Sequence, residues 1–175
     1  MKTKALIVML LTFIISVSAM SQKDPVDRIF DKYSGQEGYT TVYISSKMFS
    51  LFAEIDPDDQ ELQDMMNGLK SIRILASDDS DESAGDGINF YKEVMKDLAV
   101  EKYEELMVVK DGNQDLKFLI REENGKIVEL LLVGGGDGDN VLISIRGNID
   151  MKNIGKIGKA LDVEGLENIE KIDEK

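Results

Sequence analysis

Carboxylates are the side chains most able to do chemistry in this sequence, and they are densest in one short segment. Residues 78–87 read DDSDESAGDG and hold no large apolar side chain. Calcium prefers oxygen ligands, and alternating acids open an EF-hand loop. The EF-hand glycine and bidentate glutamate would fall on Ala84 and Phe90, so a solvated loop is expected. Weak calcium binding is left open, with four candidate metal ligands: Asp78, Asp79, Asp81 and Asp86.

A second glycine-rich segment, residues 135–142, reads GGDGDNVL and approaches a calcium-binding nonapeptide. The aspartate that this repeat requires is replaced by Asn140. Such repeats bind calcium when they are stacked in tandem, and one copy is present. We therefore interpret the segment as a hairpin loop, and no cofactor or bound metal is expected.

The residue types that are missing narrow the possible chemistry further. The chain has no histidine and no cysteine, so the usual catalytic triads, thiol nucleophiles and common zinc sites are excluded. An enzyme would have to use carboxylates, lysine, serine or tyrosine, and no local Ser-x-x-Lys pair occurs. The sequence therefore predicts a protein that is not an enzyme. A carboxylate-based hydrolase remains an alternative.

The first 21 residues have the three parts of a secretory signal peptide. Lys2 and Lys4 are followed by an apolar run over residues 5–17 and then by small residues up to Ser21. The run is shorter than a membrane-spanning helix, which needs about 20 apolar residues. Cleavage after Ala19 or after Ser21 fits this pattern; the second is preferred and would leave 22–175 as one exported domain, periplasmic or secreted. Because no cysteine is present, a lipid anchor on cysteine is impossible.

The charge of the mature chain bears on its partners. The signal segment carries two lysines and no acids, which leaves 19 basic and 34 acidic side chains and a net charge of −15. A surface this acidic repels phosphate backbones and anionic lipids, so neither nucleic acid nor an acidic membrane surface is expected as a partner. No membrane span is expected once the signal segment is cleaved. A protein partner remains possible.

The spacing of apolar residues predicts an α+β fold. Strands are expected over residues 39–45, 71–76, 105–110, 116–122, 126–134 and 140–147. The last four should form an antiparallel meander, since Asn124-Gly125 is a strong hairpin signal. Helices are expected to begin near Pro25, Lys47, Asp59, Gly87 and Asp150, and the helix from Gly87 is expected to run to about Lys102. The tail over residues 163–175 is expected to be loose.

The two faces of the predicted sheet raise a question about its surface. One face alternates cleanly, but the opposite face is also partly apolar, where a one-sided sheet should be polar. Helices from the N-terminal half either cover this face or leave it for a partner. The residues proposed as a partner surface are Leu119, Leu131, Val133 and Leu142.

Three segments in a fixed order carry a family resemblance: GYTTVYISSKMF, SIRILASDDSD and the strand-rich stretch from Glu104 to Asp150. They resemble an exported bacterial domain-of-unknown-function family, numbered 4252, over about residues 22–170. The resemblance implies a Gram-negative source and a possible role in envelope signalling. It implies no activity and no catalytic residues.

These observations predict an exported, non-catalytic interaction module. A carrier of a small ligand or lipophile, with its cavity between sheet and helices, is one alternative. A protein whose structure depends on calcium is another.

Overall fold

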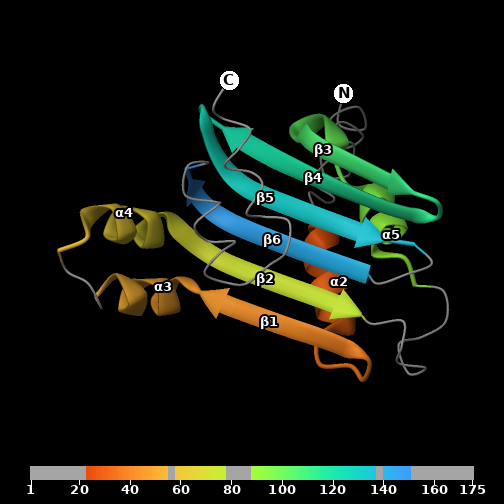
Figure 1. Cartoon of the computed structure of the whole chain (residues 1–175), viewed down its shortest axis with the longest axis horizontal. Helices are drawn as coiled ribbons and strands as arrows, with labels where there is room; N and C mark the ends of the chain where they lie inside the picture. The colour runs from red at the N-terminus through yellow and green to blue at the C-terminus, as the bar shows by residue number, and fades with distance from the viewer. Residues whose placement is uncertain (1–22, 55–57, 78–87, 137–139, 151–175) are drawn as a thin grey trace, which may run out of the picture.

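The computed structural model describes residues 23–54, 58–77, 88–136 and 140–150. It contains a six-stranded antiparallel sheet in the order β1-β2-β6-β5-β4-β3 (Figure 1). The strands are β1 Tyr39–Ser45, β2 Leu69–Ser77, β3 Glu104–Asp111, β4 Gln114–Glu123, β5 Lys126–Gly135 and β6 Asn140–Ile149. The predicted α+β class and the meander over β3–β6 are confirmed, and β2 adds to the meander beside β6.

The β4–β5 hairpin forms where the Asn-Gly pair predicts it. Asn124 has φ 55° and Gly125 has φ 73°. Two successive residues with positive φ are what a type I′ turn requires, and this turn matches the twist of the flanking strands. The turn joins β4 to β5, the strand that carries the buried carboxylate described below.

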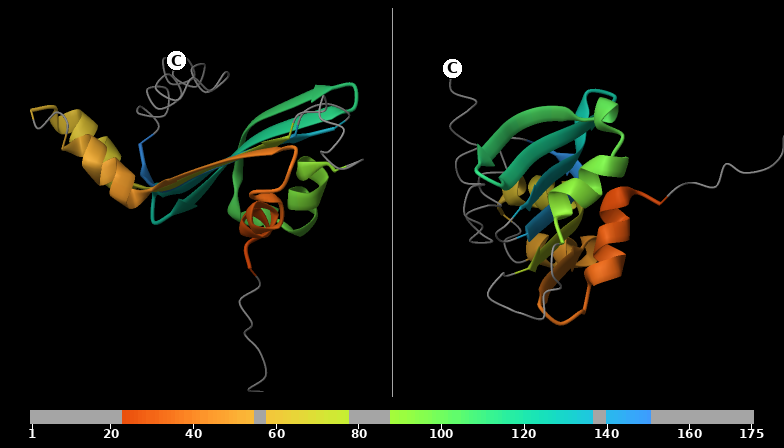
Figure 2. Two further views of the ribbon diagram at one scale, coloured as in Figure 1. Left: turned by 90° about the horizontal axis from the view of Figure 1, so that it is seen from below. Right: turned by 90° about the vertical axis from the view of Figure 1, so that its right-hand side faces the viewer.

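Two helices cover one face of the sheet. These are α2, Pro25–Tyr33, and α5, Phe90–Asp97, which lie together on one side (Figure 2). Asp24 begins α2 as predicted, since its Oδ1 accepts a hydrogen bond from the Val26 N–H at 2.8 Å. The core under these helices consists of Val26, Ile29, Phe30, Tyr33, Leu75, Phe90, Val94, Leu98, Leu119, Leu131, Val133 and Leu142.

This packing corrects the predicted partner surface. All four of its residues belong to that core and are at most 1% exposed: Leu119, Leu131, Val133 and Leu142. They face α2 and α5 because the strands alternate and this face is the covered one. The interpretation in which helices cover the face is therefore right, and these four side chains are not accessible to a partner.

The opposite face has its own apolar cluster, which includes Phe118, Leu130, Leu132, Ile143 and Ile145. Helices α3, Ser46–Ala53, and α4, Gln60–Gly68, meet the sheet at one end and project beyond it (Figure 2). From α3, Phe49 and Ala53 are buried.

The helix predicted from about Gly87 to Lys102 is shorter in the structure. Helix α5 ends at Asp97, because Leu98 has an extended conformation with ψ 130°. A short 3₁₀ turn, η1, Val100–Lys102, then leads into β3. The predicted signal peptide, the predicted acidic loop and the helix expected after Asp150 lie outside the described residues.

A buried amide from β6 holds the start of α5. The Asn140 Oδ1 accepts a hydrogen bond from the backbone N–H of Phe90 at 2.9 Å, and both residues are buried. The side chain that stands at the calcium position of the nonapeptide therefore binds backbone. We expect Asn140→Ala to lower the free energy of unfolding by about 1–3 kcal/mol, since a buried donor loses its acceptor. Urea denaturation measures this. For comparison, Asn89→Ala removes the exposed hydrogen bond from the Lys92 N–H to the Asn89 side chain and should lower the free energy of unfolding by about 1 kcal/mol. An Asn140→Ala variant with the wild-type free energy of unfolding would contradict the assignment.

Candidate functional site

A row of three charged side chains crosses the sheet under the start of α2. Glu129 on β5 lies directly opposite Arg121 on β4 and Arg146 on β6. Direct cross-strand neighbours share a face of the sheet. The row thus continues the face that carries Leu131 and Leu142 further along the same strands. The Glu129 carboxylate is 0% exposed.

Both oxygens of this carboxylate are fully engaged. Oε1 accepts hydrogen bonds from Arg146 Nε at 2.8 Å and Ser144 Oγ at 2.9 Å. Oε2 accepts from the Tyr103 hydroxyl at 2.9 Å and from Arg121 Nε and Nη2 at 3.3 Å each. With donors from four residues, the carboxylate has no position left for a substrate or a metal ion.

Arg146, together with Arg73 on β2, ties α2 to the sheet. Asp27 Oδ1 accepts hydrogen bonds from Arg73 Nη1 at 2.9 Å and from Arg146 Nη1 at 2.8 Å. Asp24 Oδ2 lies 3.5 Å from Arg146 Nη2. These acids occupy the helix N-terminus, where negative charge is favourable. We call the whole set the Glu129 network: Asp24, Asp27, Arg73, Tyr103, Arg121, Glu129, Ser144 and Arg146.

The pKa values of the acidic groups in the network are unsuited to proton transfer near neutral pH. Burial alone would raise the pKa of Glu129, but the charge and hydrogen bonds of Arg146, with those of Ser144 and Tyr103, hold that pKa below its ordinary value. Burial and the neighbouring Glu129 raise the pKa of Tyr103 well above its ordinary value. A general acid or base works best with a pKa near the operating pH. The network is therefore built for attachment of α2 rather than for acid–base catalysis.

The lowered pKa of Glu129 predicts a pH dependence of stability. A carboxylate whose folded pKa lies below its unfolded value stabilises the fold above the unfolded pKa, and this stabilisation is lost as pH falls through the folded pKa. We expect the stability difference between the wild type and Glu129→Gln to be constant above about pH 4.5 and to shrink at lower pH. Denaturant titrations from pH 7 to pH 3 measure it. A difference independent of pH over that range would contradict the assignment.

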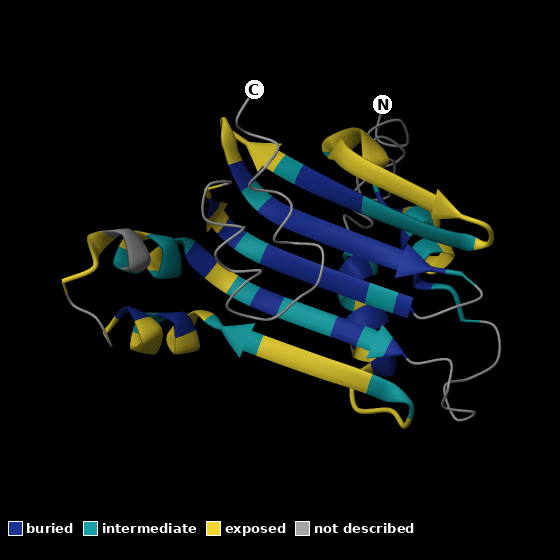
Figure 3. Ribbon diagram, in the orientation of Figure 1, coloured by how far each residue is buried: buried dark blue, intermediate teal, exposed yellow. Residues whose placement is uncertain are grey.

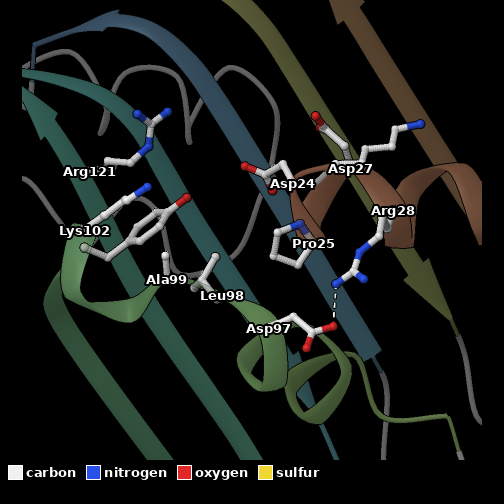
Figure 4. A pocket seen from close by; sticks show the side chains of 11 residues that line it. Asp24, Pro25, Asp27, Arg28, Asp97, Leu98, Ala99, Lys102 and Arg121 are labelled. Atoms are coloured by element: carbon white, nitrogen blue, oxygen red, sulfur yellow. Dashed lines mark hydrogen bonds and ion pairs between the residues drawn. The ribbon is translucent and has the colours of Figure 1, made fainter. Parts of the chain in front are cut away.

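A cavity of about 950 Å³ opens beside the network, between the start of α2 and the segment that joins α5 to β3. Figure 4 shows Arg28 and Asp97 facing each other across one part of it, with an ion pair at 2.5 Å. Lys102 and Arg121 line another part. Ligand sites are usually lined mainly by apolar and aromatic side chains. This charged lining does not suit a lipophile.

Strand β3 forms one edge of the sheet, and among the described residues no strand pairs with its outer side. All eight residues of this strand are exposed (Figure 3). Four consecutive apolar side chains occupy its middle, with exposed fractions of 36–43%: Leu106, Met107, Val108 and Val109. Unpaired apolar strand edges are templates for pairing with another chain, and native proteins usually protect them. The edge of β3 is therefore a better candidate for partner binding than the buried leucines.

Comparison with known proteins places the chain in a family. The model of a family described as "Domain of unknown function (DUF4252)" matches residues 33–157, more than half of the chain. The chain belongs to the DUF4252 family. No curated protein and no solved structure matches it.

The DUF4252 match contains all six strands, and so it contains Glu129, its two arginine neighbours and the β3 edge. Asp24 and Asp27 precede the matched residues. Within the described part of the chain, no helix is long and apolar enough to cross a membrane, and no three acidic residues gather as a metal site. The proposed metal ligands lie outside that part: Asp78, Asp79, Asp81 and Asp86.

Sequence reasoning did not find the Glu129 network, although a signal for it exists. On the sheet face that lies under α2 and α5, the side chains change from apolar to polar along each strand. On β5 the change is from Leu131 to Glu129. On β6 it is from Leu142 through Ser144 to Arg146. A buried face that turns polar toward one end predicts polar partners there. The partners themselves lie up to 119 residues apart in sequence.

Proposed function

We propose that this DUF4252 protein is an exported, non-catalytic interaction module that binds its partner along the free edge of β3. The observation that carries the proposal is the run of four exposed apolar residues on an edge strand, residues 106–109. An extended segment that pairs with such an edge gains main-chain hydrogen bonds, and alternate side chains give specificity.

Two further observations support a binding role over a catalytic one. The chain has no histidine or cysteine, and Glu129, the one fully buried carboxylate among the described residues, has donors on both oxygens. Export is supported by the N-terminal pattern of two lysines, an apolar run and small residues. The mass of the chain purified from cells tests export directly, since cleavage after Ser21 leaves a chain that begins at Gln22.

Partner binding is tested by comparing two aspartate variants of similarly exposed valines. Val109 on β3 is 43% exposed and Val100 in η1 is 41% exposed. A tagged chain is expressed with its own signal, crosslinked in the cells and recovered. We expect Val109→Asp to reduce recovery of the crosslinked partner at least about tenfold, because a charge placed in an apolar contact must be desolvated. Val100→Asp should leave recovery unchanged. Equal recovery by the wild type and Val109→Asp would refute the β3 assignment.

A further inference from the structure

The face of the sheet opposite α2 and α5 is more deeply buried than the described elements around it explain. One direct cross-strand row runs through the middle of this face: Met107, Phe118, Leu132, Ile143, Ile74 and Val42. The two ends of the row are 38–39% exposed, but Phe118, Leu132 and Ile143 are 3–6% exposed. Side chains stand roughly perpendicular to a sheet, so neighbours within the sheet leave their tips open to solvent. Another part of the chain must therefore lie over the middle of the row.

No described helix lies over this middle row. Helix α3 contacts β1 and β2, and α4 contacts β2 and β6, at one end of the sheet (Figure 2). In the described part of the chain, neither helix makes extensive contact with β4 or β5, which carry Phe118 and Leu132. Helices α2 and α5 pack on the opposite face. The cover therefore has to come from the other segments of the chain: residues 1–22, 55–57, 78–87, 137–139 or 151–175.

Chemistry and connection select one of these segments. Residues 1–22 lead into α2 and residues 78–87 lead toward α5, so both join helices on the opposite face. Residues 78–87 also hold no large apolar side chain, and the two other internal segments have three residues each. Residues 151–161, MKNIGKIGKAL, follow β6 directly and carry apolar side chains at helical spacing: Ile154, Ile157 and Leu161. This segment combines an apolar stripe with an attachment to a central strand.

Charge and length both favour a position over β6. The segment 151–161 carries three lysines and no acid. A cavity of about 470 Å³ at the end of β6 is lined by three acids and one lysine: Asp64, Glu122, Asp150 and Lys126. The distance along β6 from Ile149 back to Ile143 is about 20 Å at the strand rise. A helix of eleven residues is about 16 Å long, so the segment reaches the middle row if the chain reverses after Asp150.

We infer that residues 151–161 dock as an intramolecular cover on the apolar face around Phe118, Leu132 and Ile143. Their apolar side chains pack on the row, and Lys152 lies near the acids at the end of β6. The cover keeps from solvent an apolar face that would otherwise favour association. The family match extends to residue 157 and so includes Ile154 and Ile157. The cover lies away from the β3 edge and does not depend on the proposed function.

Cysteine labelling tests the cover, because the chain has no cysteine of its own. Leu131 and Leu132 are neighbours on β5 that face opposite sides of the sheet, Leu131 under α2 and α5 and Leu132 under the proposed cover. Leu131→Cys and Leu132→Cys are each made in the full chain, with and without Ile157→Asp, and the rate of reaction with a maleimide is measured. We expect Ile157→Asp to speed labelling at position 132 at least about tenfold, since local opening exposes the residues beneath it. Labelling at position 131 should change by less than about twofold.

A second substitution provides the matched control. Val163→Asp makes the same kind of change just beyond the segment and should leave both labelling rates unaltered. An unaltered rate at position 132 in the Ile157→Asp chain overturns the inference. Equal acceleration at positions 131 and 132 also overturns it, because the whole domain then opens and no separate cover exists. Crosslinking through β3 is measured independently, so either result leaves the proposed function to its own test.

Discussion

Replacing Glu129 by glutamine is expected to lower the free energy of unfolding by about 3–5 kcal/mol, because removal of one partner leaves buried charges uncompensated. Arg146 and Arg121 would lose the negative charge that both contact, and an amide NH2 would replace one of the two oxygens that accept from Arg146, Ser144, Arg121 and Tyr103. Chemical denaturation followed by circular dichroism measures the change.

The control is an exposed acid bound to the same arginine. Glu123 forms an ion pair with Arg121, and its side chain is 57% exposed. We expect Glu123→Gln to change the free energy of unfolding by about 0–1 kcal/mol, as exposed ion pairs do. Equal effects of the two glutamine variants would show that burial of Glu129 does not determine the stability of the network.

Leu131→Asp is expected to prevent folding, and this is the second large effect. Leu131 is 0% exposed at the centre of the core under α2 and α5. An unpaired carboxylate at that position loses its hydration without gaining a partner, which costs several kcal/mol. Domains of this size are stable by about 5–15 kcal/mol in total, and the loss of apolar packing adds to the cost.

Val109→Asp makes the same chemical change at a position that is 43% exposed. This variant should keep the circular dichroism spectrum and cooperative unfolding of the wild type. A Leu131→Asp variant that folded but lost partner binding would instead support the partner surface predicted from the sequence, in which Leu131 is accessible.

The parts of the fold that were predicted correctly are mostly those set by short stretches of neighbouring residues. Strand β1 occupies residues 39–45, as its β-branched and aromatic run predicts, and Asn124-Gly125 forms the expected turn. Both depend on the conformational preferences of neighbouring residues, which a sequence displays directly. Helix α5 is shorter than predicted because apolar periodicity continues past Asp97 where the backbone does not.

The position of each strand in the sheet is not readable in this way. The run over residues 106–109 resembles a core strand such as that over residues 130–133, yet the first is exposed and the second is buried. What separates them is that, in the described part of the chain, β3 pairs with one neighbouring strand and β5 with two. That difference arises from pairing between distant segments, and sequence patterns of single strands carry no information about it.

The candidate site was missed for the same reason. Glu129 and Arg146 read as isolated charges in apolar strands, but the register of β5 and β6 places them directly opposite each other. Asp27, which also binds Arg146, lies more than a hundred residues away in the chain. Only the assembled sheet with α2 in place brings the three together.

The most direct test of the role of β3 compares the two edges of the sheet in living cells. A photoreactive amino acid is placed at Val108 on β3 or at Tyr43 on β1, which is 61% exposed, and the irradiated adducts are identified by mass spectrometry. The account predicts a discrete adduct from position 108 and none from position 43. No adduct from position 108, or a discrete adduct from position 43 alone, would contradict it.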